Sequence, residues 1–245
     1  MLSTRKPLVR AVLGSILLSI LCVNFASPLL AQEEVVAVFF GDSITEAHGA
    51  STETERWVNQ VASAQGWTEF INAGIGATVL QNTRQHTVPR LGRAALNNGR
   101  DTFSRRILSH DPTHIILLYG VNDILLNDPA FTAEHFENDL GEIVARLIDA
   151  GVPAAQIVIG SAPYINPDFY TVYPNYDSGS LSEHEAYVTA AAQVAQTYQT
   201  RYADVYQAML TQGGNALLHE DGLHPNDAGN DVITQAILEA LGGEE

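Results

Sequence analysis

The stretch V-V-A-V-F-F-G-D-S-I-T, residues 35–45, indicates the architecture of this chain. Its six consecutive apolar residues, 35–40, have the length of a strand and suit burial on both faces of a sheet. The run ends at Gly41, Asp42 and Ser43, so a buried strand delivers a serine to its carboxyl end. A serine between a strand and a helix is usually a helix N-cap. The alternative is that Ser43 is placed there to react.

Other apolar runs of strand length alternate with segments of helical periodicity. The expected strands are 35–40, 69–74, 114–120, 156–163 and a short edge strand within 203–209. The expected helices are 53–66, 99–112, 128–151, 182–202 and 225–243. This alternation predicts an α/β fold with a central parallel sheet of about five strands, covered by helices on both faces. Ligands bind such sheets at the carboxyl ends of the strands.

The first 31 residues have the pattern of a signal peptide. Three basic residues precede the apolar stretch 11–23, and Ala31 offers a small residue at a cleavage point. The apolar stretch is short for a membrane span, although a retained N-terminal anchor is the alternative. We expect a signal peptide at 1–31 and a single domain at 32–245. The protein is then secreted or periplasmic, without stable membrane insertion.

The charge of the chain excludes some partners. Removal of the signal would leave nine basic residues against 28 acidic ones, a net charge of −19. So acidic a surface repels nucleic acid and anionic membranes, and we expect no nucleic acid partner. Cys22, the only cysteine, lies in the signal. The mature chain would therefore have no disulfide, no thiol nucleophile and no cysteine-rich zinc site.

A second reactive pattern, L-L-H-E-D-G-L-H-P-N-D, stands at 217–227. Asp221 and His224 are three residues apart, so the carboxylate can reach Nδ1–H of the imidazole while Nε2 faces a serine hydroxyl. The alternative is an aspartate that caps a turn beside a surface histidine. His219 would complete a set of three metal ligands, but the spacing matches no strong zinc pattern. We expect no metal and no cofactor.

Two further turns follow expected strands. In L-L-Y-G-V-N-D, 117–123, the side-chain NH2 of Asn122 is a candidate donor to an oxyanion, and a turn-forming asparagine is the alternative. In N-A-G-I-G-A-T, 72–78, glycines at 74 and 76 would let a backbone N–H approach a substrate. The alternative for that segment is a plain turn.

Taken together and in this order, these motifs resemble the SGNH hydrolases, also called GDSL esterases/lipases. The segments G-D-S-I-T, I-N-A-G-I-G-A-T, G-V-N-D and D-G-L-H match four sequence blocks of that family, and the resemblance covers roughly residues 35 to 241. Four ordered matches are far more specific than any one of them. The resemblance implies a three-layer αβα fold with a central parallel sheet in flavodoxin-like order.

The resemblance also implies roles for individual residues. Ser43 would be the nucleophile, His224 the base and Asp221 the support of that base. The oxyanion donors would be the Ser43 backbone N–H, an N–H of the second block and the side chain of Asn122. Catalysis would pass through an acyl-enzyme, with water as the usual second acceptor. From the residue types alone, we interpret Asp42 and Asp123, which flank these groups, as structural residues that hold turns through side-chain-to-backbone hydrogen bonds.

One departure from the family pattern concerns the second block. The family often places its donor glycine five residues after the asparagine, and here that position is Ala77, with Gly76 just before it. Either the turn shifts and Gly76 donates, or Ala77 donates through its own backbone. Our site prediction names Gly76. His48, five residues after Ser43, is a weaker candidate base than His224.

An aromatic segment, 161–180, follows the expected strand 156–163 and should overhang the site. Rings beside Asn and Asp suit the faces and hydroxyls of sugars, and we expect Tyr164 and Tyr170 to contact substrate. The alternative is that the tyrosines only pack the loop. These features predict a secreted serine esterase that hydrolyses short acyl esters, acetyl in particular, on a small molecule or polysaccharide.

Two other functions compete with this one. The first is an exported lipase, lysophospholipase or thioesterase that acts on longer acyl chains. The second is a catalytically silent sugar-binding module on the same fold. The sequence predicts no oligomeric state.

Overall fold

Five parallel strands form the central sheet, in the order β2-β1-β3-β4-β5. The computed structural model describes residues 35–82, 97–126, 128–174 and 176–242, so the predicted signal peptide lies outside the described residues. The strands are β1 Val36–Gly41, β2 Glu69–Asn72, β3 His114–Leu118, β4 Ile157–Gly160 and β5 Arg201–Ala203. This order is the flavodoxin-like one, with its switch point between β1 and β3. It confirms the α/β fold predicted from the alternating pattern.

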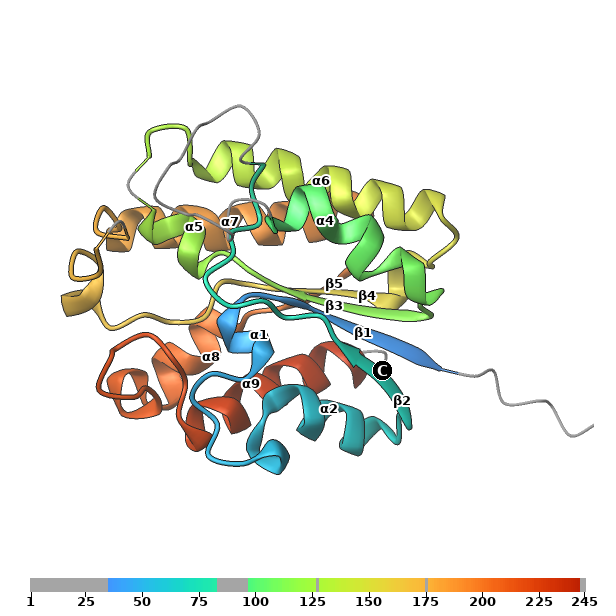
Figure 1. The fold of residues 1–245 in the computed structure, drawn as a ribbon, viewed down its shortest axis with the longest axis horizontal. Coiled ribbons are helices and arrows are strands. Elements are labelled where there is room, and N and C mark those ends of the chain that lie inside the picture. Colours follow the sequence, from blue (N-terminus) through green and yellow to red (C-terminus); the bar gives the residue numbers. More distant parts are fainter. Residues whose placement is uncertain (1–34, 83–96, 127, 175, 243–245) are drawn as a thin grey trace, which may run out of the picture. The chain divides into compact units, whose positions relative to one another are not determined.

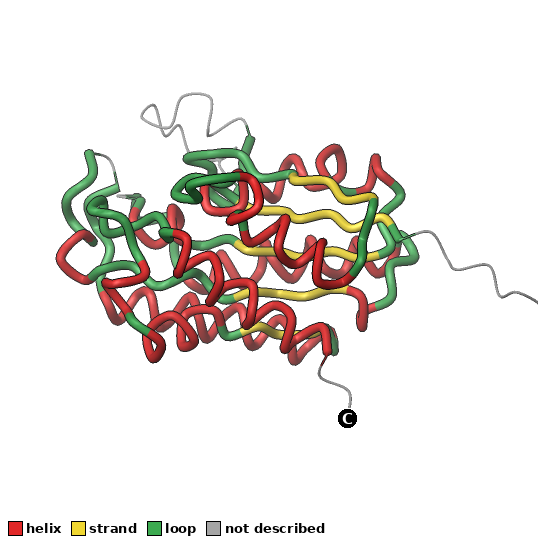
Figure 2. Tube along the Cα trace, turned by 90° about the horizontal axis from the view of Figure 1, so that it is seen from below, coloured by secondary structure: helices red, strands yellow, loops and turns green. Residues whose placement is uncertain are grey.

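Helices cover both faces of the sheet (Figure 1). One face carries α1 Ser43–Glu46, α2 Trp57–Gln65, α8 Val205–Gln212 and α9 Asp227–Gly242. The other face carries α4 Gly99–Arg106, α5 Val121–Leu125, α6 Ala133–Asp149 and α7 Leu181–Tyr198. Figure 2 looks at the sheet from the side of α2 and α9 and shows the strands side by side. Short 3-10 helices lie in the connections, at Glu53–Glu55, Leu108–His110, Ala154–Gln156, Pro167–Phe169 and Gly214–Leu217.

The interior strand β1 is apolar because both of its faces are covered. Successive side chains of a strand point to opposite faces. Phe39 packs edge-on against Trp57 of α2, with ring centroids 5.4 Å apart. Its neighbour Phe40 contacts Tyr119, which follows β3, at 5.2 Å. Both phenylalanines are fully buried. The continuous apolar run therefore reflects burial between two helical layers.

The prediction of an edge strand within 203–209 is wrong. β5 ends at Ala203, where that strand was expected to begin, and Val205–Gln212 form the helix α8. Asp204 causes the change, because its carboxylate accepts a hydrogen bond from the Gln207 N–H at 3.1 Å and caps the helix. The strand instead takes its residues from the end of the helix expected at 182–202.

The other expected elements are confirmed, most of them with shorter bounds. α6 begins at Ala133 instead of 128, because the Thr132 hydroxyl accepts from the His135 N–H at 3.2 Å and caps the helix. α4 ends at Arg106 and continues only as a 3-10 turn. Within the described ranges, no helix is both long and apolar enough to span a membrane.

A buried arginine lies beneath the turns that follow β1 and β2. Arg106 donates from Nη2 to the carbonyl oxygens of Gly41, at 2.9 Å, and of Ala73. Its Nη1 donates to the Tyr119 hydroxyl at 2.9 Å, and its guanidinium lies 4.2 Å from the centroid of the Phe40 ring. These contacts hold together the carboxyl ends of neighbouring strands.

Replacing Phe39 with alanine tests the packing of β1. We expect Phe39→Ala to lower the free energy of unfolding by about 3–5 kcal/mol, because the cavity left between β1 and α2 cannot collapse fully. Urea denaturation followed by circular dichroism measures this loss. Leu210→Ala, at a side chain that is 43% exposed, is the control and should change stability by less than about 0.5 kcal/mol. Equal effects of the two substitutions would contradict the packing described here.

Candidate active site

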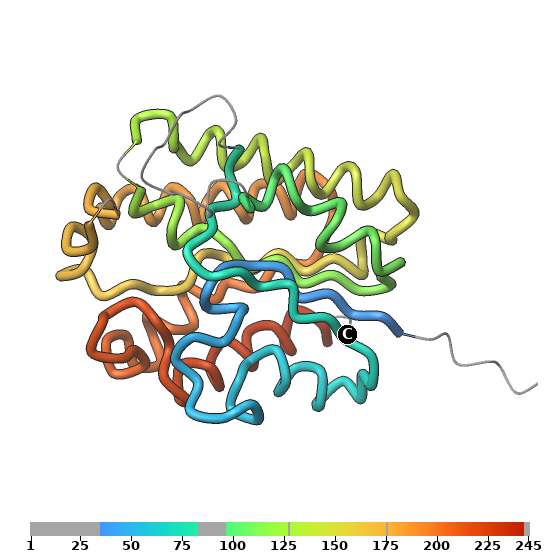
Figure 3. Tube along the Cα trace, viewed as in Figure 1, coloured from blue at the N-terminus to red at the C-terminus, as the bar shows by residue number. Residues whose placement is uncertain are grey.

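Three side chains from distant parts of the chain form a hydrogen-bonded relay at the carboxyl edge of the sheet. The Ser43 Oγ lies 2.9 Å from Nε2 of His224. The His224 Nδ1 lies 2.7 Å from Oδ2 of Asp221. Figure 3 shows the turn after β1, in blue, and the loop before α9, in red, at the same edge of the sheet. This is the geometry of a nucleophile, its base and the acid that orients the base.

The local structure leaves the Ser43 hydroxyl free for this contact. The N-cap of α1 is Asp42, whose Oδ1 accepts from the Ile44 N–H at 3.0 Å. Gly41 is required before it, because a Cβ there would lie 2.5 Å from the Leu118 carbonyl oxygen. The opening alternative is thus resolved: Asp42 caps the helix, and the side chain of Ser43 faces His224.

The loop that carries Asp221 uses both carboxylate oxygens. Oδ1 accepts from the N–H groups of Leu223 and His224, each at 3.0 Å, and Oδ2 faces the imidazole. The turn passes through Gly222 at φ +66°, a left-handed conformation that glycine adopts readily. Partial burial acts to raise the pKa of Asp221, but the hydrogen bonds from the His224 ring and from the backbone outweigh it and hold that pKa below its ordinary value. Asp221 therefore both caps its turn and stays ionised beside His224.

Two buried carboxyl groups lie behind the relay, as expected of turn-holding residues. Asp123 accepts from the N–H of Leu80 at 2.9 Å and of Gln81 at 3.0 Å, which joins α5 to the segment after β2. Burial raises its pKa to about 6, against hydrogen bonds that act to lower it. Burial likewise raises the pKa of Asp42 to about 7, although its bond from Ile44 acts in the opposite direction.

Asn122 lies in the first turn of α5 and lines the same cavity as Ser43. Its Nδ2 donates to the Thr78 carbonyl oxygen at 2.8 Å. This bond fixes the orientation of the amide and uses one of its two N–H groups. The second N–H is left to meet an oxygen atom in the cavity.

The structure gives the Gly76 N–H a partner within the chain. This N–H is already engaged, because it donates to Oε2 of Glu46 at 2.7 Å. Ala77, the next residue, has φ +57° and lines the cavity beside Gly76. The side chain of Glu46 thus reaches a turn 30 residues away. No pattern in G-D-S-I-T-E predicts this contact.

A cavity of about 500 Å³ opens at the relay. It is lined by Ser43, His48, Gly76, Ala77, Asn122, Leu125, Tyr173, Pro174, Tyr176, Leu223 and His224. Most of the wall away from the relay is apolar or aromatic. His48 lines it as well, with its ring centroid 5.4 Å from that of His224. The base in contact with Ser43 is nevertheless His224.

The structure does not bring Tyr164 and Tyr170 to this cavity. Both are buried under the loop, where Tyr164 donates to Oδ1 of Asn215 at 2.9 Å and the Tyr170 hydroxyl lies 2.8 Å from Nδ1 of His184. Burial also lowers the pKa of His184 to about 4. These two tyrosines therefore pack the loop, which was the alternative to contact with the substrate.

Two other tyrosines of the same segment line the cavity. Tyr173 donates to the carbonyl oxygen of Asp221, and Tyr176 donates to that of Ala77 at 3.1 Å. The sequence placed the right segment over the site. No pattern in the sequence distinguishes Tyr173 and Tyr176 from the buried Tyr164 and Tyr170.

The cavity continues into a shallow polar depression. It is lined by His48, Gly49, His219, Glu220, Asp221 and His224. His219 closes part of it, with its Nε2 2.6 Å from the Gly49 carbonyl oxygen. Within the described ranges, no group of three or more His, Cys, Asp or Glu side chains could hold a metal ion.

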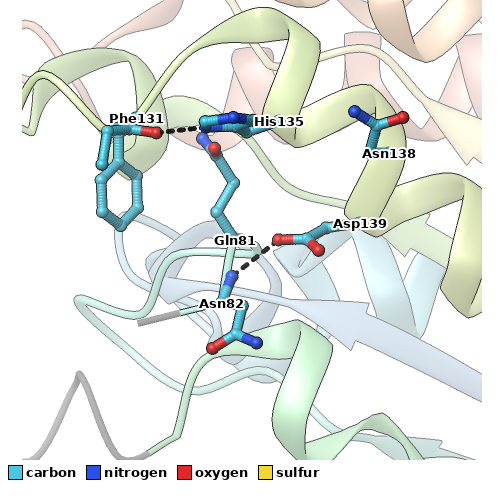
Figure 4. Close-up of a pocket in the computed structure, with 7 residues that line it drawn as sticks. Gln81, Asn82, Phe131, His135, Asn138 and Asp139 are labelled. Carbon is cyan, nitrogen blue, oxygen red and sulfur yellow. Dashed lines mark hydrogen bonds between the residues drawn. The ribbon is translucent and has the colours of Figure 1, made fainter. Parts of the chain in front are cut away.

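A separate polar cavity of about 180 Å³ lies between the segment after β2 and α6 (Figure 4). Asp139 of α6 accepts there from the Asn82 N–H at 2.7 Å and lies 3.9 Å from Nε of Arg100. None of the predicted site residues lines this cavity. The relay therefore lies away from this polar cavity.

Comparison with known proteins supplies the family. The model of the GDSL-like lipase/acylhydrolase family matches residues 39–232. None of the curated proteins compared with the chain matches it. Among solved structures, a lipase/acylhydrolase from Enterococcus faecalis is 21% identical, with a TM-score of 0.63 over 85% of this chain and 96% of that one. An alpha/beta hydrolase enzyme from the metagenome of Lake Arreo, Spain, is also 21% identical, with a TM-score of 0.61 over 85% and 95%.

An acetylxylan esterase from Geobacillus stearothermophilus is 19% identical, with a TM-score of 0.61 over 86% of this chain and 95% of that one. At these identities the likeness to solved structures concerns the fold.

The raised pKa of Asp42 predicts a pH-dependent change in stability. Between about pH 4 and pH 7 the folded chain binds more protons at Asp42 than the unfolded chain does, so this group makes the protein less stable as the pH rises through that window. Asparagine keeps the oxygen that accepts from Ile44 and removes the titration. The stability of Asp42→Asn relative to wild type should therefore increase by more than about 1 kcal/mol between pH 4 and pH 8.

Urea denaturation at several pH values measures this difference. Asp149→Asn, at an exposed carboxylate at the end of α6, is the matched control. A difference for Asp42→Asn that stays constant across the window would contradict the prediction.

Proposed function

The chain belongs to the GDSL-like lipase/acylhydrolase family and is an ester-hydrolysing enzyme, and from this premise we propose that Ser43, His224 and Asp221 perform the hydrolysis. The observation that carries the proposal is the unbroken relay, 2.9 Å from Ser43 to His224 and 2.7 Å from His224 to Asp221. These contacts argue against the alternative that the chain is a catalytically silent sugar-binding module.

The reaction proceeds in two halves. In the first, Ser43 Oγ attacks the ester carbonyl carbon while His224 Nε2 takes the hydroxyl proton, and the imidazolium then protonates the departing alkoxide. The product of this half is an acyl-enzyme and a free alcohol. In the second half His224 takes a proton from water, the hydroxide attacks the acyl carbon, and Ser43 leaves with its proton restored. A carboxylic acid is released.

The negative charge of each tetrahedral intermediate needs fixed donors. We assign the stabilisation of this charge to the Ser43 backbone N–H, the second N–H of Asn122 and an N–H of the turn at 76–77, because these residues line the same cavity. Asp221, whose pKa is held low, holds the Nδ1–H tautomer of His224 and stabilises the imidazolium.

We propose that the substrate is a short acyl ester, acetyl in particular, of a carbohydrate. Tyr173 and Tyr176 offer flat faces for a sugar ring beside the relay, and His219 and Glu220 offer partners for its hydroxyls in the adjoining depression. A neighbouring fold that is named an acetylxylan esterase supports the same class of substrate. Secretion is part of this proposal and rests on the predicted signal peptide, 1–31.

A second candidate substrate is an ester with a longer acyl chain. Leu125, Pro174 and Leu223 form an apolar wall, and a cavity of about 500 Å³ is far larger than an acetyl group requires. This wall favours an exported lipase, lysophospholipase or thioesterase.

Substitutions in the relay test the mechanism. We expect Ser43→Ala and His224→Ala each to lower kcat for 4-nitrophenyl acetate by about 10⁴-fold or more, because no nucleophile or no base remains. Asp221→Asn should cost less, about 10²- to 10⁴-fold, since Ser43 and His224 remain. Circular dichroism checks that each variant is folded. Full activity of Asp221→Asn would overturn the assignment of the relay.

A series of 4-nitrophenyl esters from acetate to dodecanoate separates the two substrates. The proposed function predicts the highest kcat/KM at acetate and a steady fall with chain length, with Ser43→Ala inactive throughout. A maximum at octanoate or beyond would instead assign the apolar wall of the cavity to a long acyl chain.

A further inference from the structure

The side chain of Glu46 joins the turn after β1 to the turn after β2 at the edge of the sheet that carries the relay. Glu46 is the last residue of α1, three positions after Ser43. Its Oε2 accepts from the Gly76 N–H at 2.7 Å and lies 3.5 Å from Nε2 of His48. The side chain is 47% exposed, so the bond to Gly76 is not enforced by burial in the core. The relay and the proposed reaction make no use of this carboxylate.

Other hydrogen bonds hold the same turn on both sides of the peptide group between Gly76 and Ala77. The Ile75 N–H donates to the Gly41 carbonyl oxygen at 3.1 Å, and the Ala77 carbonyl oxygen accepts from Tyr176 at 3.1 Å. The peptide group between Gly76 and Ala77 is thus fixed on either side. Among the described residues no acceptor meets the Ala77 N–H, although Ala77 lines the cavity.

The backbone of Ala77 is strained, because its φ of +57° lies in the left-handed region. A residue with a Cβ adopts that conformation only at a cost, and an isolated turn would relax away from it. A neighbouring contact must therefore hold the turn, and the bond from Gly76 to Glu46 is the contact next to it in the chain.

We propose that Glu46 is a positioning residue of the oxyanion site, whose carboxylate holds the Gly76 N–H and so keeps Ala77 in the left-handed conformation that presents the Ala77 N–H to the substrate carbonyl oxygen. The inference rests on the proposed function, because it concerns the donors of that same reaction. Gly76 then anchors the turn, and Ala77 supplies the second-block N–H.

An opposite role for Glu46 would leave an opposite signature. If its carboxylate only competed with the oxyanion for the Gly76 N–H, removing it would free a donor and raise the rate. The sign of the change in kcat therefore separates positioning from blocking.

Three single variants measure the effect on 4-nitrophenyl acetate hydrolysis. Glu46→Ala should lower kcat by about 10- to 100-fold with little change in KM, because a misplaced donor weakens binding of the transition state more than binding of the ester. Glu46→Gln should stay within about 3-fold of wild type, since its amide oxygen accepts the same bond. Glu185→Ala, at an exposed glutamate of α7, is the matched control and should behave as wild type.

A rescue experiment tests the link to Ala77. Glycine adopts the left-handed conformation without the penalty of a Cβ. The loss in kcat caused by Glu46→Ala should therefore be at least about 3-fold smaller when it is measured in an Ala77→Gly background than in the wild-type background. A general loss of stability would not be repaired by adding a more flexible residue.

The outcomes distinguish this inference from the proposed function. If wild type hydrolyses no ester, or if Ser43→Ala is as active as wild type, the proposed function fails. If wild type is active and Ser43→Ala is not, then a Glu46→Ala rate equal to or above that of wild type overturns the role of Glu46 alone. A loss in Glu46→Ala that Glu46→Gln shares, or that Ala77→Gly does not relieve, overturns it as well.

Discussion

The buried guanidinium of Arg106 ties together the carboxyl ends of two neighbouring strands. It donates to the last carbonyl of β1, at Gly41, and to Ala73 just after β2, and its planar face rests on Phe40. Carbonyl groups at the end of a parallel strand have lost their partners in the sheet, and burying them without a donor is costly. Arg106 donates to both carbonyls, and the Gly41 carbonyl accepts from the Ile75 N–H as well. The turns that carry the nucleophile and the second-block N–H therefore start from a common anchor.

Side chains complete the hydrogen bonding of the backbone around this anchor. Asp42 accepts from the Ile44 N–H at the start of α1, and Asp123 accepts from two N–H groups after β2. Asn122 donates to a carbonyl of the same segment. Each of these bonds is buried, where a lost partner is expensive. Ser43, Asn122 and Ala77 line the cavity at this edge, and the Ser43 hydroxyl pairs there with His224. One N–H of Asn122 and the N–H of Ala77 are the donors that the proposed reaction uses.

The cavity combines surfaces of two kinds at this edge. Tyr173 and Tyr176 are held by hydrogen bonds to the loops that carry Asp221 and Ala77, so the aromatic wall and the catalytic turns are parts of one network. The polar depression begins on the other side of His224, around His219 and Glu220. An ester lying across the relay would meet an apolar surface on one side and polar groups on the other. That division suits a substrate whose two halves differ in polarity.

The sequence by itself determined the layered fold and the residues of the relay. Apolar runs of strand length reveal strands buried on both faces, and the short separation of Asp221 and His224 makes their pairing a local property of one loop. The prediction from sequence was wrong at 203–209, where the local pattern fits either a strand or a helix. Asp204 caps a helix there instead of continuing a strand.

Only the tertiary structure decided which N–H of the second-block turn is free, which tyrosines line the cavity and that Glu46 contacts Gly76. Each of these depends on a hydrogen bond between segments 30 or more residues apart. No periodicity encodes such a partner, because the direction of a side chain in a turn follows from the surfaces that meet there after folding.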